Sequence, residues 1–382
     1  MKNPRIIIAG GGPVGVVSAL ACAQYGYAVT LLEAEDRIDD NPRAATTHPS
    51  TLELIARVGL IDQFIGEGLV ARFFQFWDKP SRTKIVEFDH EFLRAETPYP
   101  FVVQTEQHKL AQMGIERLTT FPNATVRFSS RATTVNQDAE GATVTIEGPR
   151  GTETLRGEYV IGADGGRSTI RKALEIEFEG FTWPERFLVL TTIEDFQKLL
   201  TGCCYRNYLA DPNEWTNLFK VAGDDGKGRW RAVFPTRVEE SDEQALGDDS
   251  TYSRLQRVFP IDRPYNVVHR NLYKVHQRVA NENGPKKILR VLQESVQDSG
   301  IVFAGTHLLP NPQTAQRKDT RFHSGKEKGQ NRTEAHEKQE WQISVHRGSS
   351  PRFRATSTRI SRTRTSVDVA PHPPPHPQPY PP

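Results

Sequence analysis

The sequence predicts an α/β fold, with a doubly wound, Rossmann-like nucleotide-binding domain, a β-rich second domain and a disordered C-terminal tail. Three observations support this prediction. A buried strand, a glycine turn and a helix open the chain, alternating strands dominate its middle, and its composition changes abruptly near residue 281. The length of 382 residues allows about two domains of ~150 residues each.

The first elements form one predicted βαβ unit. Residues 5–9 (RIIIA) are an apolar run without alternation, which is typical of a parallel strand buried on both faces. Residues 13–25 have helical spacing, and Gly26 follows where a helix C-cap belongs. Residues 28–33 (AVTLLE) then provide the next strand.

The turn between that strand and helix carries the first chemical signal. Residues 10–15 (GGGPVG) match G-x-G-x-x-G, and Glu33 ends the next strand 23 residues after the first glycine. Such glycines allow a tight turn, approach of a pyrophosphate and close helix packing, while the helix N-terminus offers free amides. Glu33 would accept hydrogen bonds from ribose hydroxyls and repel a ribose phosphate, which favours FAD or NAD over NADP. A glycine turn without a ligand is the alternative. The candidate cofactor-binding residues are Gly10, Gly12, Pro13, Val14, Gly15 and Glu33.

Further elements follow from local patterns. The predicted helices cover residues 51–58 and 107–118, and the predicted strand-like segments cover residues 73–92, 124–155, 159–164, 187–235 and 270–280.

A second motif follows the strand predicted at residues 159–164. Residues 162–171 (GADGGRSTIR) contain D-G-x-x-S-x-x-R. This segment resembles the signature of FAD-dependent aromatic hydroxylases, the single-component monooxygenases typified by para-hydroxybenzoate hydroxylase and phenol hydroxylase. The resemblance implies that Asp164 and Gly165 lie near the FAD ribose and pyrophosphate and near the path of the nicotinamide donor. Alone, the segment is equally compatible with an ordinary capped helix start.

Two shorter segments resemble the same family. Residues 42–54 (PRAATTHPSTLEL) are similar to the stretch in which an arginine reaches toward FAD, and residues 104–107 (QTEQ) are similar to the segment whose glutamine contacts the cofactor. The resemblance therefore implies cofactor contacts for Arg43 and Gln104. His48 falls in the first of these segments and would lie near the flavin, with a helix-capping or surface role as the favoured alternative.

The resemblance covers about residues 1–280 and implies a reaction. FAD would be reduced by NADH or NADPH, and O2 would then supply a hydroxyl group to a small aromatic, usually phenolic, substrate. A catalytically impaired flavoprotein and a flavin-dependent reductase or dehydrogenase stay open as alternatives. No catalytic residue is assigned, because aromatic residues in the strand-rich segment expected to line the substrate pocket are more often core. The polar and aromatic residues in question there are Tyr205, Arg206, Tyr208, Trp230 and Arg231.

The C-terminal part departs from the family pattern. A third flavin motif should contain an Asp, but residues 300–312 (GIVFAGTHLLPNP) carry Thr306 at that position and lack a Gly-Gly loop. Residues 281–382 hold 16 basic and 9 acidic residues, and eight of the last twelve residues are proline. An altered reading frame and a divergent tail both explain this change. Residues 313–382 are predicted to be a disordered, basic tail.

These patterns predict the domain boundaries. The FAD-binding domain is assigned residues 1–72 and 102–174, and the β-rich substrate domain residues 73–101 and 175–270. Residues 271–312 are assigned to a remnant of the last FAD-binding segment.

Composition bears on the expected partners, metal content and location of the protein. A formal net charge of +2 gives no field that favours nucleic acid, and no segment approaches the ~20 apolar residues of a membrane span. Three cysteines and the N-terminal sequence favour a cytoplasmic protein without a disulfide framework. No metal site is predicted, because the histidines lack ligand spacing. A homodimer is possible.

Overall fold

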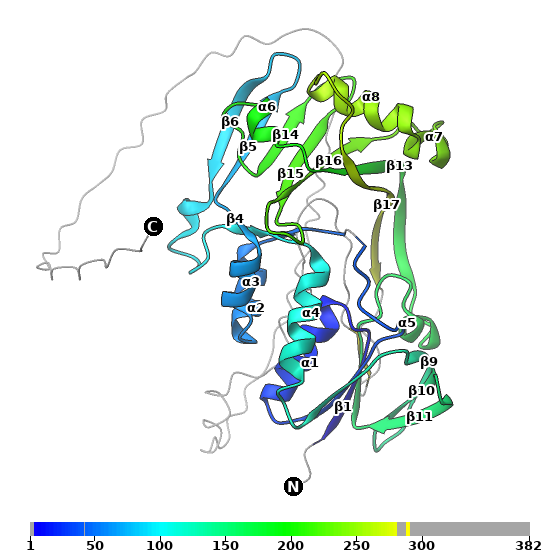
Figure 1. Cartoon of the computed structure of the whole chain (residues 1–382). Helices are drawn as coiled ribbons and strands as arrows, with labels where there is room; N and C mark the ends of the chain where they lie inside the picture. The colour runs from blue at the N-terminus through cyan, green and yellow to red at the C-terminus, as the bar shows by residue number, and fades with distance from the viewer. Residues whose placement is uncertain (1–3, 42, 281–287, 291–382) are drawn as a thin grey trace, which may run out of the picture. The chain divides into compact units, whose positions relative to one another are not determined.

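The computed structural model describes residues 4–41, 43–280 and 288–290 (Figure 1). The predictions for Thr306, for the rest of residues 291–312 and for the tail at 313–382 lie outside the described residues. The helices are α1 (Pro13–Gln24), α2 (Pro49–Arg57), α3 (Ile61–Glu67), the 3-10 helix η1 (His90–Leu93), α4 (Gln107–Leu118), α5 (Thr169–Ala173), α6 (Phe196–Leu199), α7 (Asp242–Leu246) and α8 (Asp248–Val258).

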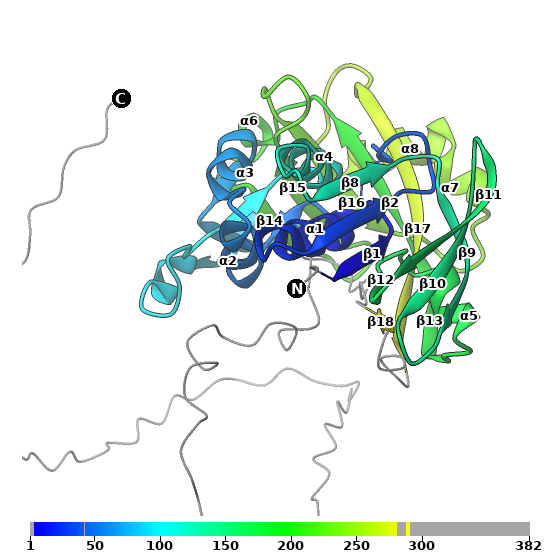
Figure 2. The same cartoon turned by 90° about the horizontal axis from the view of Figure 1, so that it is seen from below.

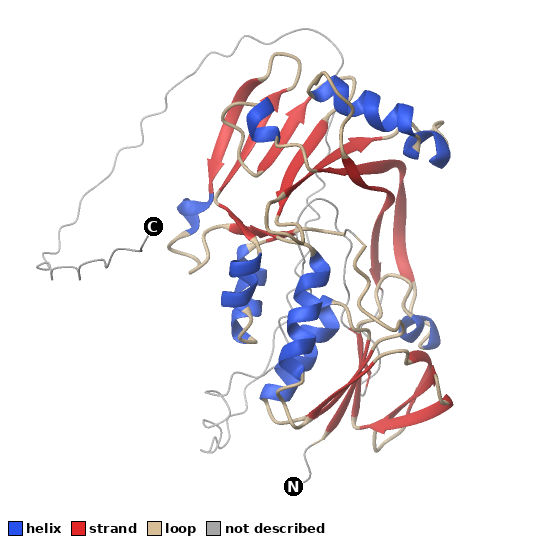
Figure 3. Cartoon of the chain, viewed as in Figure 1, coloured by secondary structure: helices blue, strands red, loops and turns tan. Residues whose placement is uncertain are grey.

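The strands form four sheets (Figure 3). The parallel sheet has the order β18 (Ile288–Arg290), β12 (Tyr159–Gly162), β1 (Arg5–Ala9), β2 (Ala28–Leu32) and β8 (Ala124–Arg127). Two three-stranded sheets contain β11 (Gly151–Gly157), β10 (Ala142–Gly148) and β9 (Arg131–Gln137), and β3 (Thr46–Thr47), β7 (Val102–Gln104) and β4 (Leu69–Ala71). The largest sheet has the order β17 (Val267–Ala280), β13 (Phe178–Thr192), β16 (Arg229–Pro235), β15 (Thr216–Val221), β14 (Arg206–Ala210), β5 (Phe73–Asp78) and β6 (Thr83–Asp89).

The parallel sheet is covered on both faces, as its apolar strands predict. Strand β1 lies between β12 and β2, and Ile7 and Ile8 are fully buried. Helices α1 and α4 cover one face, where Gly114 of α4 allows close packing because a Cβ there would lie 2.1 Å from a methyl group of Val16. The other face is covered by β9–β11 and the short helix α5, where a doubly wound fold usually has helices (Figure 2).

The seven-stranded sheet joins two distant parts of the chain. Strands β5 and β6 come from residues 73–89, and the other five come from residues 178–280. Helices α6 and α8 cover one face, where Trp230, Phe196 and Leu255 form a core. Strand β17 crosses the predicted boundary at residue 270, because it pairs with β13 from Val267 to Ala280 with two register shifts. The other domain boundaries stay predictions.

The predicted helices at residues 13–25, 51–58 and 107–118 correspond to α1, α2 and α4. Helices α3, α7 and α8 were not predicted. Among the described residues, no helix is both long and apolar enough to cross a membrane.

Candidate functional site

The glycine turn after β1 shows a different spatial requirement at each of its glycines. Gly10 has φ +111°, and a Cβ there would lie 2.3 Å from the carbonyl oxygen of Ala163. A Cβ at Gly15 would lie 1.9 Å from the carbonyl oxygen of Gly10, so α1 packs directly on the turn. By contrast, a Cβ at Gly12 would meet no atom within 4 Å. Gly10 and Gly15 are therefore required by packing, whereas Gly12 borders open space.

The N-terminus of α1 is free of side-chain caps. Its N-cap is Gly12, Pro13 occupies the first turn, and that turn holds no acidic residue. Side chains cap four other described helices, with the acceptors Asp89 at η1, Ser168 at α5, Asp195 at α6 and Ser241 at α7. The first amides of α1 therefore have their partial positive charge available to an anion. Val14 lies behind this end and is buried.

Glu33 folds back onto the glycine turn. Its Oε2 accepts a hydrogen bond of 2.8 Å from the amide of Gly11, and its Oε1 accepts one of 3.0 Å from the amide of Glu35. A Cβ at Gly11 would lie 2.7 Å from Oε2 of Glu33. Gly11, which stands at an unspecified position of the motif, thus has a role of its own, which is to let the Glu33 carboxylate approach.

A cleft of about 370 Å³ lies at this turn. The predicted site residues that line it are Gly10, Gly12, Pro13, Glu33, Arg43, Asp164 and Gly165. Among the lining residues that were not predicted are His108, Arg131 and Arg167. Val14, Gly15 and Gln104 are not among its lining residues.

Asp164 is held by its own loop. Its Oδ1 accepts a hydrogen bond of 2.5 Å from the Ser168 hydroxyl, and its Oδ2 accepts hydrogen bonds from the amides of Thr169 at 2.7 Å and Ile170 at 3.1 Å. Gly165 has φ +77° and open space at its Cβ position. The carboxylate therefore fixes the loop at the start of α5, while the adjacent glycine backbone borders the cleft.

The charges at the mouth of the cleft are largely paired. Arg43 lies 2.6 Å from Asp39, and Arg131 lies 2.7 Å from Glu35. The backbone of Arg43 also reaches the seven-stranded sheet, because its carbonyl oxygen accepts a hydrogen bond of 2.7 Å from Nη1 of Arg231.

Gln104 lies apart from this cleft. It is fully buried in β7, where its Oε1 accepts a hydrogen bond of 2.5 Å from the Thr46 hydroxyl. Its Nε2 lies 3.5 Å from the carbonyl oxygen of Tyr205. Gln104 thus connects the sheet of β3, β7 and β4 to the residue before β14. A cofactor contact for Gln104 stays a prediction.

The comparisons with known proteins agree with this geometry. A family model described as an FAD binding domain matches residues 4–289. Para-nitrophenol 4-monooxygenase of Pseudomonas sp. (strain WBC-3) is 30% identical over 278 residues, covering 72% of this chain and 68% of that protein. The 6-hydroxy-3-succinoylpyridine 3-monooxygenase of Pseudomonas putida (strain DSM 28022 / S16) is 31% identical over 282 residues, covering 72% and 69%. The chain belongs to the FAD-dependent aromatic hydroxylases.

Solved structures of this family share the fold. The crystal structure of p-nitrophenol 4-monooxygenase from Pseudomonas putida DLL-E4 is 27% identical, has a TM-score of 0.69, and is matched over 76% of this chain and 73% of that one. A flavin-dependent monooxygenase solved with FAD and substrate is 18% identical, with a TM-score of 0.68 over 79% and 54% of the two chains. The predicted family and its FAD-binding fold are confirmed.

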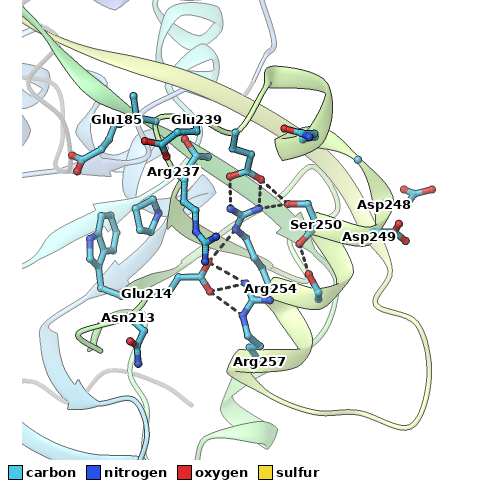
Figure 4. A pocket seen from close by; sticks show the side chains of 18 residues that line it. Glu185, Asn213, Glu214, Arg237, Glu239, Asp248, Asp249, Ser250, Arg254 and Arg257 are labelled. Carbon is cyan, nitrogen blue, oxygen red and sulfur yellow. Dashed lines mark hydrogen bonds and ion pairs between the residues drawn. The ribbon is translucent and has the colours of Figure 1, made fainter.

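A larger hollow of about 1340 Å³ lies beside α8 (Figure 4). Two of its arginines are already paired with carboxylates, since Arg254 binds Glu240 at 2.8 Å and Glu214 at 3.1 Å, and Arg257 binds Glu214 at 3.0 Å. It borders neither the glycine turn nor α1. The smaller cleft is therefore the better candidate for the nucleotide of this hydroxylase family.

His48 is a titratable group at the N-cap of α2, where its side chain makes no capping hydrogen bond. Its Nε2 is buried and has no hydrogen-bond partner among the described residues. Burial, together with the positive charges of Arg206 and His90, lowers the pKa of His48 to about 4. The imidazole is therefore neutral near pH 7.

His48→Gln is expected to reduce the acid sensitivity of the fold. The unfolded chain binds a proton at His48 near pH 6.5, whereas the folded chain does so only near pH 4. Stability is therefore lost as the pH falls between these values. From pH 7 to pH 5 the wild type should lose about 2 kcal/mol more free energy of unfolding than the variant. Urea unfolding at both pH values measures this, and equal losses would contradict it.

Proposed function

We propose that this chain binds FAD in the glycine cleft and hydroxylates a phenolic aromatic compound, using NADH or NADPH and O2. The observation that carries the proposal is the uncapped N-terminus of α1 beside the open position at Gly12, with Glu33 directed at the same turn. Free amides at a helix N-terminus and a close backbone approach suit a pyrophosphate. An acid at the tip of the next strand suits a ribose.

Different residues of the cleft would contact different parts of FAD. The amide of Gly12 and the first amides of α1 after Pro13 would bind the pyrophosphate. Gly10, whose amide donates to the Leu32 carbonyl at 2.8 Å, and Pro13, which has no amide hydrogen, would shape the turn, and Val14 and Gly15 would fix the helix behind it. The remaining candidates are Glu33, Arg43, Gln104, Asp164 and Gly165. Because the Asp164 carboxylate is bonded to its own loop, we propose that it shapes the loop and that Gly165 supplies the close contact. Bound FAD would supply the redox chemistry, accepting electrons from the nicotinamide and activating O2.

The names of the relatives indicate a class of substrate for this chain. One acts on para-nitrophenol and another on 6-hydroxy-3-succinoylpyridine, and in both compounds a ring hydroxyl lies opposite a polar substituent. We propose the same arrangement, a hydroxyl para to a polar group, for the substrate of this chain. A cytoplasmic location and a homodimer are also part of the proposal.

A catalytically impaired flavoprotein is the second candidate function. It is favoured by Thr306, which stands where the family has an Asp, and by the end of the family match at residue 289. A Thr lacks the negative charge that makes an Asp a strong acceptor for flavin hydroxyls.

Flavin content and turnover separate these functions. The full chain, purified with added FAD, should retain flavin at near-stoichiometric level by absorbance. Para-nitrophenol should then stimulate NADH or NADPH oxidation with matching O2 uptake, and meta-nitrophenol should do so less. Retained flavin without stimulated oxidation would identify the impaired form. Turnover with an artificial acceptor and no O2 uptake would identify a reductase. Absence of flavin would refute the proposal and support the impaired form.

A further inference from the structure

One row of side chains crosses the seven-stranded sheet. Arg206 on β14 pairs with Phe219 on β15, which pairs in turn with Arg231 on β16. The row continues through Thr191 on β13 to His269 on β17. Residues directly opposite one another in adjacent strands point to the same face of a sheet. These five side chains therefore share one face.

This face is turned toward the FAD-binding part of the chain. The opposite face carries Trp230 and the core beneath α6 and α8. On the row's own face, Arg231 donates to the carbonyl oxygen of Arg43, and the charge of Arg206 acts on His48. The side chains of the row therefore face residues 43–48. Arg43 in this segment also lines the glycine cleft.

The two arginines of the row differ from the other buried cations. Among the described residues, Lys79, Arg186 and Arg254 are also buried, and each forms an ion pair with at least one carboxylate. Arg206 and Arg231 form none within 4.0 Å in the same part of the chain, although their exposed fractions are only 4% and 5%. The acid whose charge acts on Arg231 is Glu106, which is itself paired with Lys109 at 3.0 Å.

Buried nitrogens of the same two arginines also lack hydrogen-bond partners among the described residues. Nε and Nη1 of Arg206 and Nε of Arg231 are buried without a partner among the described residues, as are Oγ1 of Thr191 and Nδ1 of His269. Burying a charged donor without an acceptor costs several kcal/mol. Two neighbouring guanidinium groups in this state indicate that this face receives a ligand with oxygen acceptors.

We propose that Arg206 and Arg231 bind the two oxygen-bearing ends of the aromatic substrate, with its ring lying over Phe219. This inference rests on the proposed function. The two arginines are two strands apart, about 10 Å between backbones, so their side chains can reach both ends of one ring. Phe219 provides an apolar surface between them for ring packing.

Arg206 binds the charged substituent, and Arg231 faces the hydroxyl end. Arg206 has two buried nitrogens without partners, whereas Arg231 has one. Nη1 of Arg231 already donates a hydrogen bond to the carbonyl oxygen of Arg43. Nη2 of Arg206 also donates to the Tyr208 hydroxyl at 3.2 Å, which leaves the Tyr208 proton available to the same anion. The Arg206 guanidinium stacks over Phe74 at 5.3 Å, which fixes its position.

A charged and a neutral ligand of equal shape test this assignment. The probes are 4-hydroxybenzoate and 4-hydroxybenzamide, titrated by calorimetry into the FAD-loaded full chain. The wild type should bind the carboxylate at least about tenfold more tightly than the amide, the factor expected for a hydrogen bond to a charged group. Arg206→Gln should abolish this preference with little change in amide binding, and Arg231→Gln should weaken both ligands by a similar factor.

The controls separate binding from folding. Arg229→Gln changes an arginine on the same strand as Arg231 that is already paired with Asp225 at 2.9 Å, so the preference should persist. Arg206→Lys should retain part of the preference and Tyr208→Phe should reduce it, which keeps the test valid if Arg206→Gln fails to fold. Equal binding of the two probes by the wild type, or an unchanged preference in Arg206→Gln, would overturn the inference while retained flavin upholds the proposed function. Absence of flavin in the same samples would instead refute the proposed function.

Discussion

Gly12→Ala is expected to leave the chain folded but to weaken FAD binding at least tenfold, whereas Gly15→Ala should destroy the fold. The two substitutions add the same methyl group three residues apart. At Gly12 the new carbon meets nothing within 4 Å and the backbone, with φ −70° and ψ 176°, is open to any residue. The methyl group therefore projects only into the space that a pyrophosphate would occupy.

The same methyl group at Gly15 has no space. It would lie 1.9 Å from the carbonyl oxygen of Gly10 and 3.4 Å from the Cβ of Ala163. Both are parts of the rigid junction between β1, β12 and α1, so the helix itself must shift. Overpacking of a core typically costs about 1–3 kcal/mol, and a backbone contact this short should exceed that range.

Thermal unfolding and flavin titration together measure the contrast. Gly12→Ala should melt within about 2 °C of the wild type without FAD, and Gly15→Ala should give little folded protein. The thermal stabilisation that FAD gives the wild type should be reduced in Gly12→Ala. A folded Gly12→Ala variant that retains full FAD affinity would show that no phosphate approaches the turn.

The strand, turn and helix around the glycine motif could be predicted from the sequence because their physics is local. Gly10, Gly12, Gly15 and Glu33 belong to one βαβ unit, so their positions follow from the strand, turn and helix that contain them. The role of Gly11 was not predictable, because the motif leaves that position unspecified and only the approach of Glu33 requires a glycine there.

Residues far apart in the sequence were harder to place. The alignment of Arg206, Phe219 and Arg231 depends on the register of two hairpins, which neither spacing nor alternation determines. Both arginines were named within a pocket-lining segment, but their common face and their lack of carboxylate partners needed the structure. Similarly, the segment of Gln104 resembles a cofactor-contacting stretch, yet the side chain packs against Thr46.

Helix α8 was not predicted because its buried face includes a charged residue that is stabilised by distant partners. Its buried face consists of Thr251, Arg254, Leu255 and Val258, and two of these four residues would ordinarily be assigned to solvent. Arg254 is buried only because Glu214, at the end of the loop before β15, and Glu240 meet it there. The hydrophobic pattern of α8 is therefore interrupted by a residue whose partners lie 40 and 14 positions away.

Arg254→Met is accordingly expected to destabilise the fold by about 3–5 kcal/mol, the usual result of removing one partner of a buried ion pair. Only 7% of the Arg254 side chain is exposed, and its two carboxylate partners are 17% and 15% exposed (Figure 4). Methionine would fill much of the space but leave Glu240 without its cation. Urea unfolding of the full chain at pH 7 measures the loss.

Arg257→Met is the matched control, since Arg257 binds the same Glu214 at 3.0 Å but its side chain is 53% exposed. Its loss should be below about 1 kcal/mol because water screens an exposed pair. Adding Glu240→Gln to Arg254→Met should recover part of the lost stability, since the buried charge then disappears with its partner. Equal losses in Arg254→Met and Arg257→Met, or no recovery in the double variant, would mean that packing rather than charge pairing holds α8 to the sheet.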